Sequence, residues 1–556
     1  MDTQPDGVPG TALAALLRAA PWLPEHQRRA DRFRIADWAE LPAPAPPEGR
    51  NPDGRLLLLV VAPEGGTADG TRYFVPVALP AGPAGAAALA EAHGTAAFDT
   101  AAVRRVLAGR PLRTARGHLV EFRPAGRPDG DRPVRQLPFA RGWSSNALSL
   151  VDLAGRPHIH KTYRALDPDT REPDLLRLMD GGGRTPALAG DYGYLDTGTG
   201  VRHPLGVVYA YAPGDGVDAP LRANMRSLWP LLRDAAAPER TAVAHLAPLE
   251  RELRRAGSFL RGFHDDLRAR IGEGAASHLP FPAEHHLDEA ARRLGELAPA
   301  VAAGDGLPAR VSRAALDALR REVTGIRARL RDPATSAPPS GPCHGDLHLS
   351  HLLCRPRDGA DDRADGGWEL CVIDLSTPCA DPDSPHYPDQ SPWQDLVAVQ
   401  RALEYFTADE AAEHAAHLLG TDNLSAARAA LLDTAGALVG TPGWPPGRRA
   451  VLRRVHLAAD AWRARVLRLL LDGYARGGAS PAGHPLWRLL RLRRLLHEVA
   501  YNQAHDRPYY LAMDLRHALA PAAPTTDPAP SAPAATDPTA APVPAAPGAP
   551  TRSPED

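Results

Sequence analysis

Two neighbouring segments decide the fold of this chain: PCHGDLHLSHLLC at residues 342–354 and WELCVIDLSTP at residues 368–378. Each contains a short apolar run and one aspartate, Asp346 in the first segment and Asp374 in the second. A hydrophilic, glycine-containing stretch separates them. This pattern predicts two strands of a hairpin, which would bring the loops that carry the two aspartates close together.

The chain contains a single lysine. Of its 64 lysine and arginine residues, only Lys161 is a lysine. Codon usage in a GC-rich genome is one explanation, and it leaves the single lysine to chance. The functional alternative is that a bulkier, forked guanidinium cannot replace a compact ammonium that reaches from a strand to phosphates. Lys161 lies near the end of residues 146–163, where two alternating runs predict a β-hairpin.

Two carboxylates and a remote lysine are the groups that phosphoryl transfer from a nucleotide requires. The lysine binds the phosphates, one aspartate orients and deprotonates the attacking hydroxyl, and the second aspartate holds Mg²⁺. Such catalysis depends on positioning and electrostatics, so few side chains suffice. A helix with Pro173 in its first turn is predicted from Arg171. Its acids Glu172 and Asp174 are both candidate partners for Lys161, although acids are common at helix starts in any case.

The predicted fold class is α+β. One helical stretch and strand-like runs, among them a hairpin over residues 54–80, indicate a small N-terminal α+β domain. Strand signals dominate the next region, and apolar residues at helical spacing dominate the third. The Ala/Pro-rich end is predicted to be a disordered tail. The predicted domains are residues 1–134, 135–216, 217–519 and 520–556.

Composition excludes several classes of protein. A formal net charge of −2 gives no indication of nucleic-acid or anionic-membrane binding. The longest apolar run, residues 56–63, is far shorter than the roughly 20 residues that span a bilayer. The N-terminus lacks the pattern of a signal peptide, so a cytoplasmic location is expected.

Four cysteines occur close together in the sequence, and histidines lie among them. Their spacing matches no paired Cys-x-x-Cys zinc pattern. A role as small core hydrophobes near an active site is the favoured interpretation, and a cytosolic chain would keep them reduced. The cysteines are Cys343, Cys354, Cys371 and Cys379, and the histidines are His344, His348 and His351.

Longer matches point to a family. HGDLHLSHLL (344–353), VIDLSTP (372–378) and SPWQDLVAVQRALEYF (391–406) together resemble the aminoglycoside-phosphotransferase-like kinases. Within that family the chain looks like the maltokinase group, which includes bacterial glucosamine kinases. Co-linear similarity covers most of the chain. Residues 72–80 and 117–124 resemble an N-terminal cap domain, 160–179 the lysine strand and its helix, 204–216 the strand between the lobes, and 495–515 the C-terminal helix and Arg-Pro turn.

The resemblance implies a fold, a reaction and roles for particular residues. The fold would be two-lobed and protein-kinase-like, with a cap domain and a large, mostly helical C-lobe. ATP and Mg²⁺ would be the cofactors, with Mn²⁺ possible, and the partner would be a small sugar or aminosugar. Asp346 would be the catalytic base, Asp374 the metal ligand and Lys161 the phosphate anchor. Further nucleotide-site residues would be Glu172, Asp174, Ser145, Asn146, Val208 and Tyr209, and acceptor residues would be His348, Glu498 and Asn502.

Some of these residues have simpler interpretations. Ser145 and Asn146 lie in a hairpin turn, where such residues need no ligand. Glu498 and Asn502 are four residues apart on one helix face, and both could simply be exposed to solvent. His344 is interpreted as a structural residue that fixes the catalytic loop. Asp395 is either a helix N-cap or part of the scaffold of the site.

The sequence departs from the family at two places. Five residues after Asp346 the family has an amide as its second metal ligand, and this chain has His351. Imidazole suits softer metals than Mg²⁺, so His351 binds metal through a water, favours Mn²⁺, or leaves one metal site weak. The alternative is that it simply packs at the strand start. After the metal aspartate, maltokinases have Asp-Phe-Glu-Gly-Glu-Pro, whereas residues 374–378 read DLSTP. The lost acids point to a different acceptor or efficiency.

Three functions follow from these features. The first is an ATP-dependent sugar kinase, with maltose to maltose 1-phosphate as the leading reaction and aminosugars, aminocyclitols or aminoglycosides as rival acceptors. The second is a nucleotide-binding pseudokinase, which His351 and DLSTP favour and the retention of Lys161, Asp346 and Asp374 opposes. The third is a scaffold that recruits partners through the tail. The sequence leaves the oligomeric state open.

Overall fold

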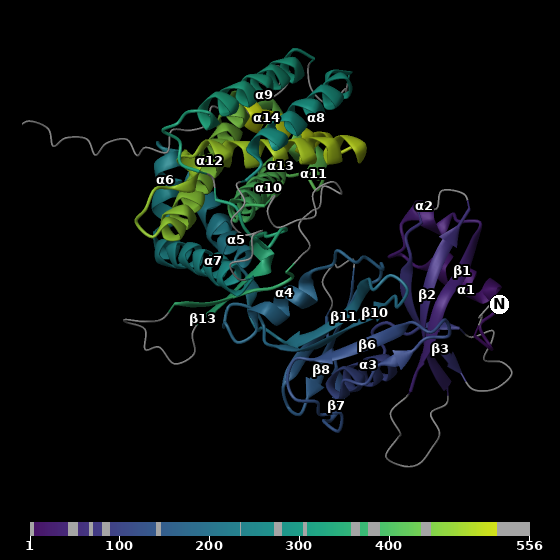
Figure 1. The fold of residues 1–556 in the computed structure, drawn as a ribbon. Helices are drawn as coiled ribbons and strands as arrows, with labels where there is room; N and C mark the ends of the chain where they lie inside the picture. The colour runs from purple at the N-terminus through teal and green to yellow at the C-terminus, as the bar shows by residue number, and fades with distance from the viewer. Residues whose placement is uncertain are drawn as a thin grey trace, which may run out of the picture. The chain divides into compact units, whose positions relative to one another are not determined.

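The computed structural model describes residues 5–42, 54–65, 70–80, 89–140, 146–233, 235–271, 281–303, 309–337, 339–356, 367–375, 390–434 and 446–519. Residues 1–519 form one compact unit. Its first half contains two antiparallel sheets, and its second half is mostly helical with one small sheet (Figure 1). The predicted α+β class, with a mostly helical region in the second half, is confirmed. The predicted tail lies outside the described residues.

The first sheet is antiparallel and follows the order of the chain. The apolar run in β2 is buried on both faces, because successive side chains of a strand point to opposite sides. Leu57 and Leu59 pack with helix α1, while Leu58 and Val60 pack with helix α3. The predicted hairpin over residues 54–80 is confirmed. The elements are α1 (Gly10–Ala19), α2 (Glu25–Arg28), β1 (Arg32–Leu41), β2 (Gly54–Glu64), β3 (Tyr73–Pro80), β4 (Ala90–Glu91) and α3 (Ala96–Ala108).

The second sheet has seven strands in the order β5-β6-β10-β11-β9-β8-β7. It therefore contains strands from both sides of the predicted boundary at residue 134. The predicted hairpin over residues 146–163 is confirmed, and its turn contains Ala154 and Gly155 at positive φ. The strands are β5 (Leu112–Arg113), β6 (Leu119–Pro124), β7 (Val134–Leu137), β8 (Ala147–Leu153), β9 (Pro157–Thr162), β10 (Leu188–Leu195) and β11 (Arg202–Ala210).

Strand β9 has different partners on its two faces. His160 is buried against α3, where its Nδ1 lies 2.9 Å from Oδ1 of Asp99. Lys161, the next residue, points to the opposite face. That face is covered by α4 (Glu172–Met179), a helix with Pro173 in its first turn, as predicted. The strand thus connects the core beneath α3 to the site that contains Lys161.

The third sheet contains the apolar runs that follow Asp346 and precede Asp374. β13 (Leu352–Pro356) pairs with β14 (Trp368–Val372) in antiparallel register, with Leu353 opposite Cys371. The predicted hairpin is confirmed. β12 (Asp215–Gly216) adds an edge strand, and the 3₁₀ turn η5 (Leu349–His351) precedes β13.

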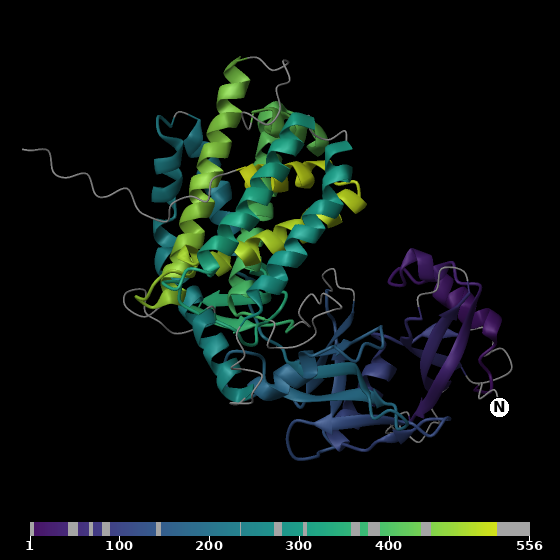
Figure 2. The same ribbon diagram turned by 45° about the horizontal axis from the view of Figure 1, so that its top comes forward.

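The helical region is built around a long pair, α7 and α12, which lie side by side in both ribbon views (Figures 1 and 2). Glycines permit their close approach, since a Cβ on Gly257 would lie 1.9 Å from the carbonyl oxygen of Leu470. Gly473 likewise faces the carbonyl of Arg254. The helices are α5 (Asp218–Leu228), α6 (Pro238–His245), α7 (Glu250–Ile271), α8 (Ala283–Ala303), α9 (Ala309–Leu330), α10 (Trp393–Leu419), α11 (Leu424–Thr434), α12 (Pro446–Ala475), α13 (Pro485–Ala504) and α14 (Pro508–Leu519), with 3₁₀ turns η2 (Trp229–Leu232), η3 (Ala247–Leu249) and η7 (Pro481–Gly483).

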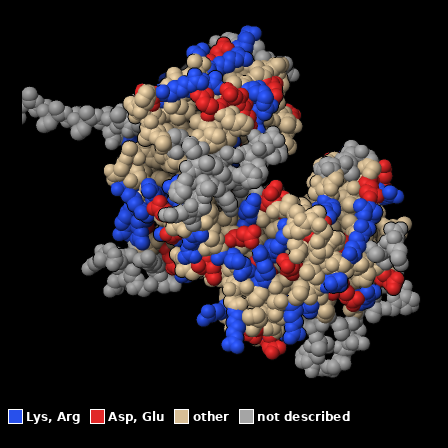
Figure 3. All heavy atoms as spheres, viewed as in Figure 1, with Lys and Arg blue, Asp and Glu red and all other residues tan. Residues whose placement is uncertain are grey.

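The surface has a mixed charge. Figure 3 shows basic and acidic side chains interspersed over the face in view. Among the described residues, no helix combines the length and the apolar character needed to cross a bilayer.

Candidate active site

Lys161 is buried between two carboxylates. Only 5% of the residue is exposed, and its Nζ lies 2.7 Å from Oε2 of Glu172 and also donates to Asp374. Asp374 lies 213 residues further along the chain. Burial disfavours the charge of Lys161, but the two carboxylates hold the pKa of Lys161 above its usual value. The lysine is therefore a fixed cation that joins the β-rich part of the molecule to the third sheet.

Of the two acids in α4, Glu172 faces Lys161. Glu172 is 3% exposed and also accepts a hydrogen bond from the Tyr163 hydroxyl at 2.7 Å. Asp174 is instead exposed and pairs with Arg123 at 3.0 Å. Residues two positions apart in a helix point about 200° apart around its axis, so Glu172 and Asp174 cannot face the same site. Asp174, assigned to the nucleotide site from the sequence, is not brought there by the structure.

Asp374 lies in the loop directly after β14, with its backbone at a φ of +57°. A positive φ is uncommon outside glycine and costs conformational energy at such a position. Burial would raise the pKa of Asp374, but hydrogen bonds from His351 and Lys161, and the charge of Lys161, lower it well below its usual range. The carboxylate is therefore charged and directed at the centre of the site.

The loop that carries Asp346 is held from behind by Asp395, the third residue of α10. The carboxylate of Asp395 accepts hydrogen bonds from the backbone N–H groups of His344 and Gly345 at 2.6 and 2.9 Å. Its Oδ2 also lies 2.8 Å from Nε2 of the buried His264. Asp395 is 1% exposed, and it acts on the backbone of the loop, as a scaffold residue would. The carboxylate of Asp346 itself has no bonding partner among the described residues, so it is available to an acceptor.

Two histidines tie the Asp346 loop to the Asp374 loop. His344 is buried, and its Nε2 lies 2.9 Å from the carbonyl oxygen of Ile373. Nδ1 of His351 lies 3.0 Å from the carbonyl oxygen of Asp346, and its Nε2 lies 3.2 Å from Oδ2 of Asp374. The predicted structural role of His344 thus has a geometric basis. His351 lies between the two aspartates.

The residues at this point fit a divalent cation. Asp374 supplies a charged oxygen, and Nε2 of His351 lies 3.2 Å from Oδ2 of Asp374. Nδ1 of His351 faces the carbonyl oxygen of Asp346 and can carry the ring proton, so Nε2 would be free to exchange its hydrogen bond to Asp374 for a bond to a metal. An oxygen and an imidazole nitrogen suit Mn²⁺ better than Mg²⁺. His351 and Asp374 are therefore the residues that would hold a metal.

His348 packs against His351, with ring centroids 3.5 Å apart. Its Nδ1 lies 2.8 Å from Oγ of Ser350. Burial, followed by the neighbouring His351, lowers the pKa of His348 to about 4. His348 is therefore neutral near pH 7 and suited to hydrogen bonding.

The remaining predicted nucleotide residues lie around Lys161 on the second sheet. Val208 and Tyr209 are buried in β11, whose Val207 lies opposite Lys161. Asn146 directly precedes β8, the other neighbour of β9. Ser145 lies outside the described residues. The structure thus places Lys161 between the two strands that carry its predicted neighbours.

The three described cysteines, Cys343, Cys354 and Cys371, are free thiols. Burial raises the pKa of each, to about 11 for Cys354 and about 12 for Cys371. Among the described residues, no cysteine is part of a group with metal-binding spacing. Cys379 lies outside the described residues.

Glu498 and Asn502 line a cavity of about 350 Å³, near the low end of the range for small-molecule sites. We call it the α13 pocket. Five lining residues follow the helical spacing of α13, two come from α10, and two follow α13. They are Arg494, His497, Glu498, Tyr501 and Asn502, then Tyr405 and Asp409, then Arg507 and Tyr510.

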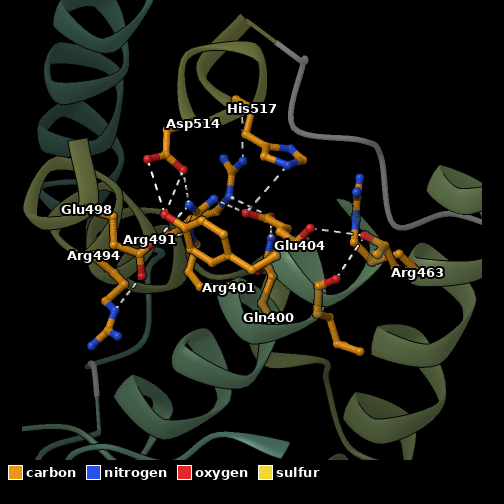
Figure 4. Close-up of polar contacts among 12 residues, drawn as sticks. Gln400, Arg401, Glu404, Arg463, Arg491, Arg494, Glu498, Asp514 and His517 are labelled. Carbon is orange, nitrogen blue, oxygen red and sulfur yellow. Dashed lines mark hydrogen bonds and ion pairs between the residues drawn. The ribbon is translucent and has the colours of Figure 1, made fainter. Parts of the chain in front are cut away.

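Beneath the pocket lies a buried arginine that the sequence analysis did not single out. Arg401 is 1% exposed and contacts three carboxylates, those of Glu404, Glu498 and Asp514 (Figure 4). The second oxygen of Glu498 accepts a hydrogen bond from Arg494 at 2.8 Å. Because both arginines offset the cost of burial, the pKa of Glu498 is lowered. Helical spacing could have revealed Arg401, since it follows the buried Val397 by four residues.

Comparisons with known proteins give structural neighbours only. No family model and no curated protein matches the sequence. A glucosamine kinase in one crystal form is 18% identical, with 91% of this chain and 98% of that chain covered and a TM-score of 0.49. The same kinase in complex with glucosamine, ADP and inorganic phosphate gives the same identity and coverage and a TM-score of 0.44. An amicoumacin kinase in complex with AMP-PNP and Ca²⁺ is 12% identical, with 69% and 87% covered and a TM-score of 0.33.

These neighbours are kinases of the group that the sequence motifs resemble. Every identity is at or below 18% and every TM-score is below 0.5. The function of this chain is therefore argued from its own site.

Proposed function

We propose that this chain is an ATP-dependent kinase that transfers a phosphoryl group to a hydroxyl of a small sugar or aminosugar. The observation that carries the proposal is the meeting of Lys161, Glu172 and Asp374 from three separate segments. Beside them a loop held by Asp395 presents the carboxylate of Asp346, which has no partner among the described residues. Phosphoryl transfer needs a phosphate-binding cation, a metal-binding carboxylate and a base in this relation.

Each residue has a definite part in the reaction. Lys161, held by Glu172, binds the nucleotide phosphates. Asp346 accepts the proton of the acceptor hydroxyl as its oxygen bonds to the γ-phosphorus, while the bond from that phosphorus to the β,γ-bridging oxygen breaks and ADP leaves. A divalent metal held by Asp374 and His351 would neutralise charge on the phosphates. Asp395 fixes the backbone of the Asp346 loop, so that the carboxylate of Asp346 is already in position before the reaction.

The α13 pocket supports an acceptor of modest size. It is lined by hydrogen-bonding side chains and by tyrosines, which are common in sugar sites because a ring packs on the aromatic face. Maltose, giving maltose 1-phosphate, is the first acceptor to test, and glucosamine, aminocyclitols and aminoglycosides follow.

The test is ADP release from ATP by the purified protein against these acceptors, in Mg²⁺ and separately in Mn²⁺. Lys161→Ala and Asp346→Asn serve as matched inactive variants. Acceptor-dependent ADP that is absent in both variants supports the proposal. Silence with every acceptor and both metals, with ATP still bound, would instead identify a nucleotide-binding pseudokinase.

A further inference from the structure

One charged group of the α13 pocket is unaccounted for. Arg507 begins the turn into α14, and its guanidinium carbon lies 4.3 Å from the centre of the Tyr510 ring and 5.7 Å from that of Tyr501. The tyrosines fix the guanidinium by cation–π contact. No acidic side chain pairs with Arg507 in the part of the chain that the structure describes.

The two acids that line the pocket, in contrast, already contact arginines. Glu498 uses one oxygen for Arg401 and the other for Arg494. Oδ1 of Asp409 accepts hydrogen bonds from the Tyr510 hydroxyl at 2.8 Å and from Arg428 at 3.2 Å. Each carboxylate therefore faces an arginine already. An ammonium group entering the pocket would have to compete with these arginines, and it would also meet the charge of Arg507.

The histidine in the wall adds no positive charge near neutral pH. Burial, and then the charge of Arg494, lowers the pKa of His497 below its usual value. Arg507 is therefore the cation of the pocket lining that has no carboxylate partner among the described residues.

A second feature marks where a neutral group binds. Asn502 is 1% exposed, and its amide nitrogen donates to the Tyr405 hydroxyl and to Asp514, each at 2.9 Å. Its Oδ1 is buried and has no hydrogen-bond partner among the described residues. An unsatisfied buried oxygen is costly, and a hydroxyl of a ligand would satisfy it.

The pocket also has a direction. Arg401 contacts Glu498 and the Tyr405 hydroxyl contacts Asn502, so α10 and α13 run in the same direction. The His497 end of the pocket therefore lies toward Asp395 and the loop that it holds, and the reacting hydroxyl belongs at that end. Tyr501 lies one helical turn further along α13, and Arg507 follows beyond its end. A ligand that presents a hydroxyl to Asp346 thus extends toward Arg507.

We propose that the acceptor carries an anionic group, such as a carboxylate, on the part that faces Arg507, and that the pocket discriminates against cationic aminosugars. This inference rests on the proposed function and narrows its substrate class to acidic sugars. Oδ1 of Asn502 accepts a hydrogen bond from a hydroxyl of the sugar ring, and the sugar ring packs against the tyrosines beside Arg507. The charge of Arg507 gives the selectivity.

The test is a charge series of monosaccharides: glucose, glucuronate, glucosamine and N-acetylglucosamine. Dissociation constants are measured by calorimetry without ATP, and kcat/KM is measured with ATP wherever turnover is seen. Glucuronate is expected to bind roughly 10- to 100-fold more tightly than glucose, the range of one charge-assisted hydrogen bond. Glucosamine is expected to bind more weakly than glucose, and its N-acetyl derivative to recover the affinity of glucose.

Variants of Arg507 assign the effect. Arg507→Gln is expected to lose the glucuronate preference with less than about a twofold change for glucose, and Arg507→Glu to invert it. Arg507→Lys keeps the charge and is expected to retain a preference. Arg321→Gln, an exposed arginine of α9, is the matched control and should change nothing.

Three results would overturn the inference: glucosamine binding at least as tightly as glucuronate, no binding by any sugar of the series, or equal losses for all sugars in Arg507→Gln and Arg507→Lys. The binding series needs no turnover, so it is separate from the proposed function. Turnover that prefers glucosamine would contradict the proposal of an acidic acceptor and would still support the proposed kinase activity.

Discussion

The two charged regions of the molecule are balanced in opposite ways. Around Lys161 a single cation faces Glu172 and Asp374, with Asp346 on the adjoining loop, so negative charge is in excess. In the lining of the α13 pocket Asp409 and Glu498 each face an arginine, and Arg507 has no acidic partner in the described part of the chain. The first region is completed by a cation, and the second by an anion.

The regions also differ in how they are built. The first consists of strand ends and short loops whose backbones are fixed by Asp395 and His344. The second consists of side chains on long helices, held by the buried guanidinium of Arg401. Changes in the first should therefore affect catalysis with little effect on stability, and changes in the core of the second should affect stability first.

The largest expected effect is that of Asp346→Asn. Its carboxylate has no partner among the described residues, so its loss removes the base without leaving a buried charge. Acceptor-dependent ADP formation is expected to fall roughly 10²- to 10⁴-fold, the usual contribution of a general base. Initial rates at saturating ATP measure this. Equal melting temperatures and ATP affinities for the two proteins are the control, and a less than fivefold loss of rate would deny Asp346 its role.

The second prediction concerns Arg401→Leu in the other region. Removing this guanidinium leaves Glu404, Glu498 and Asp514 buried without it. Breaking a buried ion pair in this way costs about 3–5 kcal/mol in free energy of unfolding. Urea denaturation followed by circular dichroism gives the difference.

The matched control for Arg401→Leu is Arg494→Leu. Arg494 also pairs with Glu498, but its side chain is 30% exposed, so its loss should cost about 1 kcal/mol or less. If both variants lost the same small amount, Arg401 would not be the cation that holds the helices together.

The third prediction concerns the single lysine, through Lys161→Arg. The Nζ atom is enclosed by Glu172, Asp374 and the Tyr163 ring, which leaves no room for a forked guanidinium. We expect kcat/KM for ATP to fall about 100-fold. Arg164→Lys, three residues along the chain, is the control and should leave the KM for ATP unchanged. Activity within threefold of the wild type would mean that the single lysine is explained by codon usage and not by function.

Much of the catalytic side could be predicted from the sequence, because its residues lie in short motifs at strand ends. Lys161, Asp346 and Asp374 were identified in this way, and the hairpins that carry two of them are confirmed. The choice between Glu172 and Asp174 could not be made, since it depends on the rotation of α4 against the sheet. The pairing of β6 with β10, across a predicted domain boundary, is a long-range contact that local patterns do not show.

The acceptor side was only partly predictable. Glu498 and Asn502 were named from the resemblance, and both line the α13 pocket. Arg507 was named only as part of the Arg-Pro turn in the resemblance and was given no role, because an arginine at a helix end looks like any solvated residue. Its significance comes from what surrounds it: two tyrosine rings, and acids that already face other arginines. Only the assembled helices show which charge is left without a partner.

The smallest predicted effect is the pH dependence caused by Asp514. One guanidinium cannot fully neutralise three buried acids, and burial raises the pKa of Asp514 to about 6 even though Arg401 opposes the rise. A carboxyl whose pKa is higher in the folded than in the unfolded chain binds its proton more tightly when folded. Its contribution to stability is therefore complete below the ordinary value of 3.8 and is lost as the pH rises through about 6.

Asp514→Asn removes this titration while keeping the shape of the side chain. Other groups titrate as well, so the quantity to measure is the difference in unfolding free energy between the wild type and this variant at pH 4.5, 5.5, 6.5 and 7.5. We expect the wild type to lose about 2 kcal/mol relative to the variant over this range. A difference that is flat, or that grows in favour of the wild type as the pH rises, would mean that Asp514 stays charged. Three ionised acids would then surround the one guanidinium of Arg401, and this cluster would be more negative than the structure indicates.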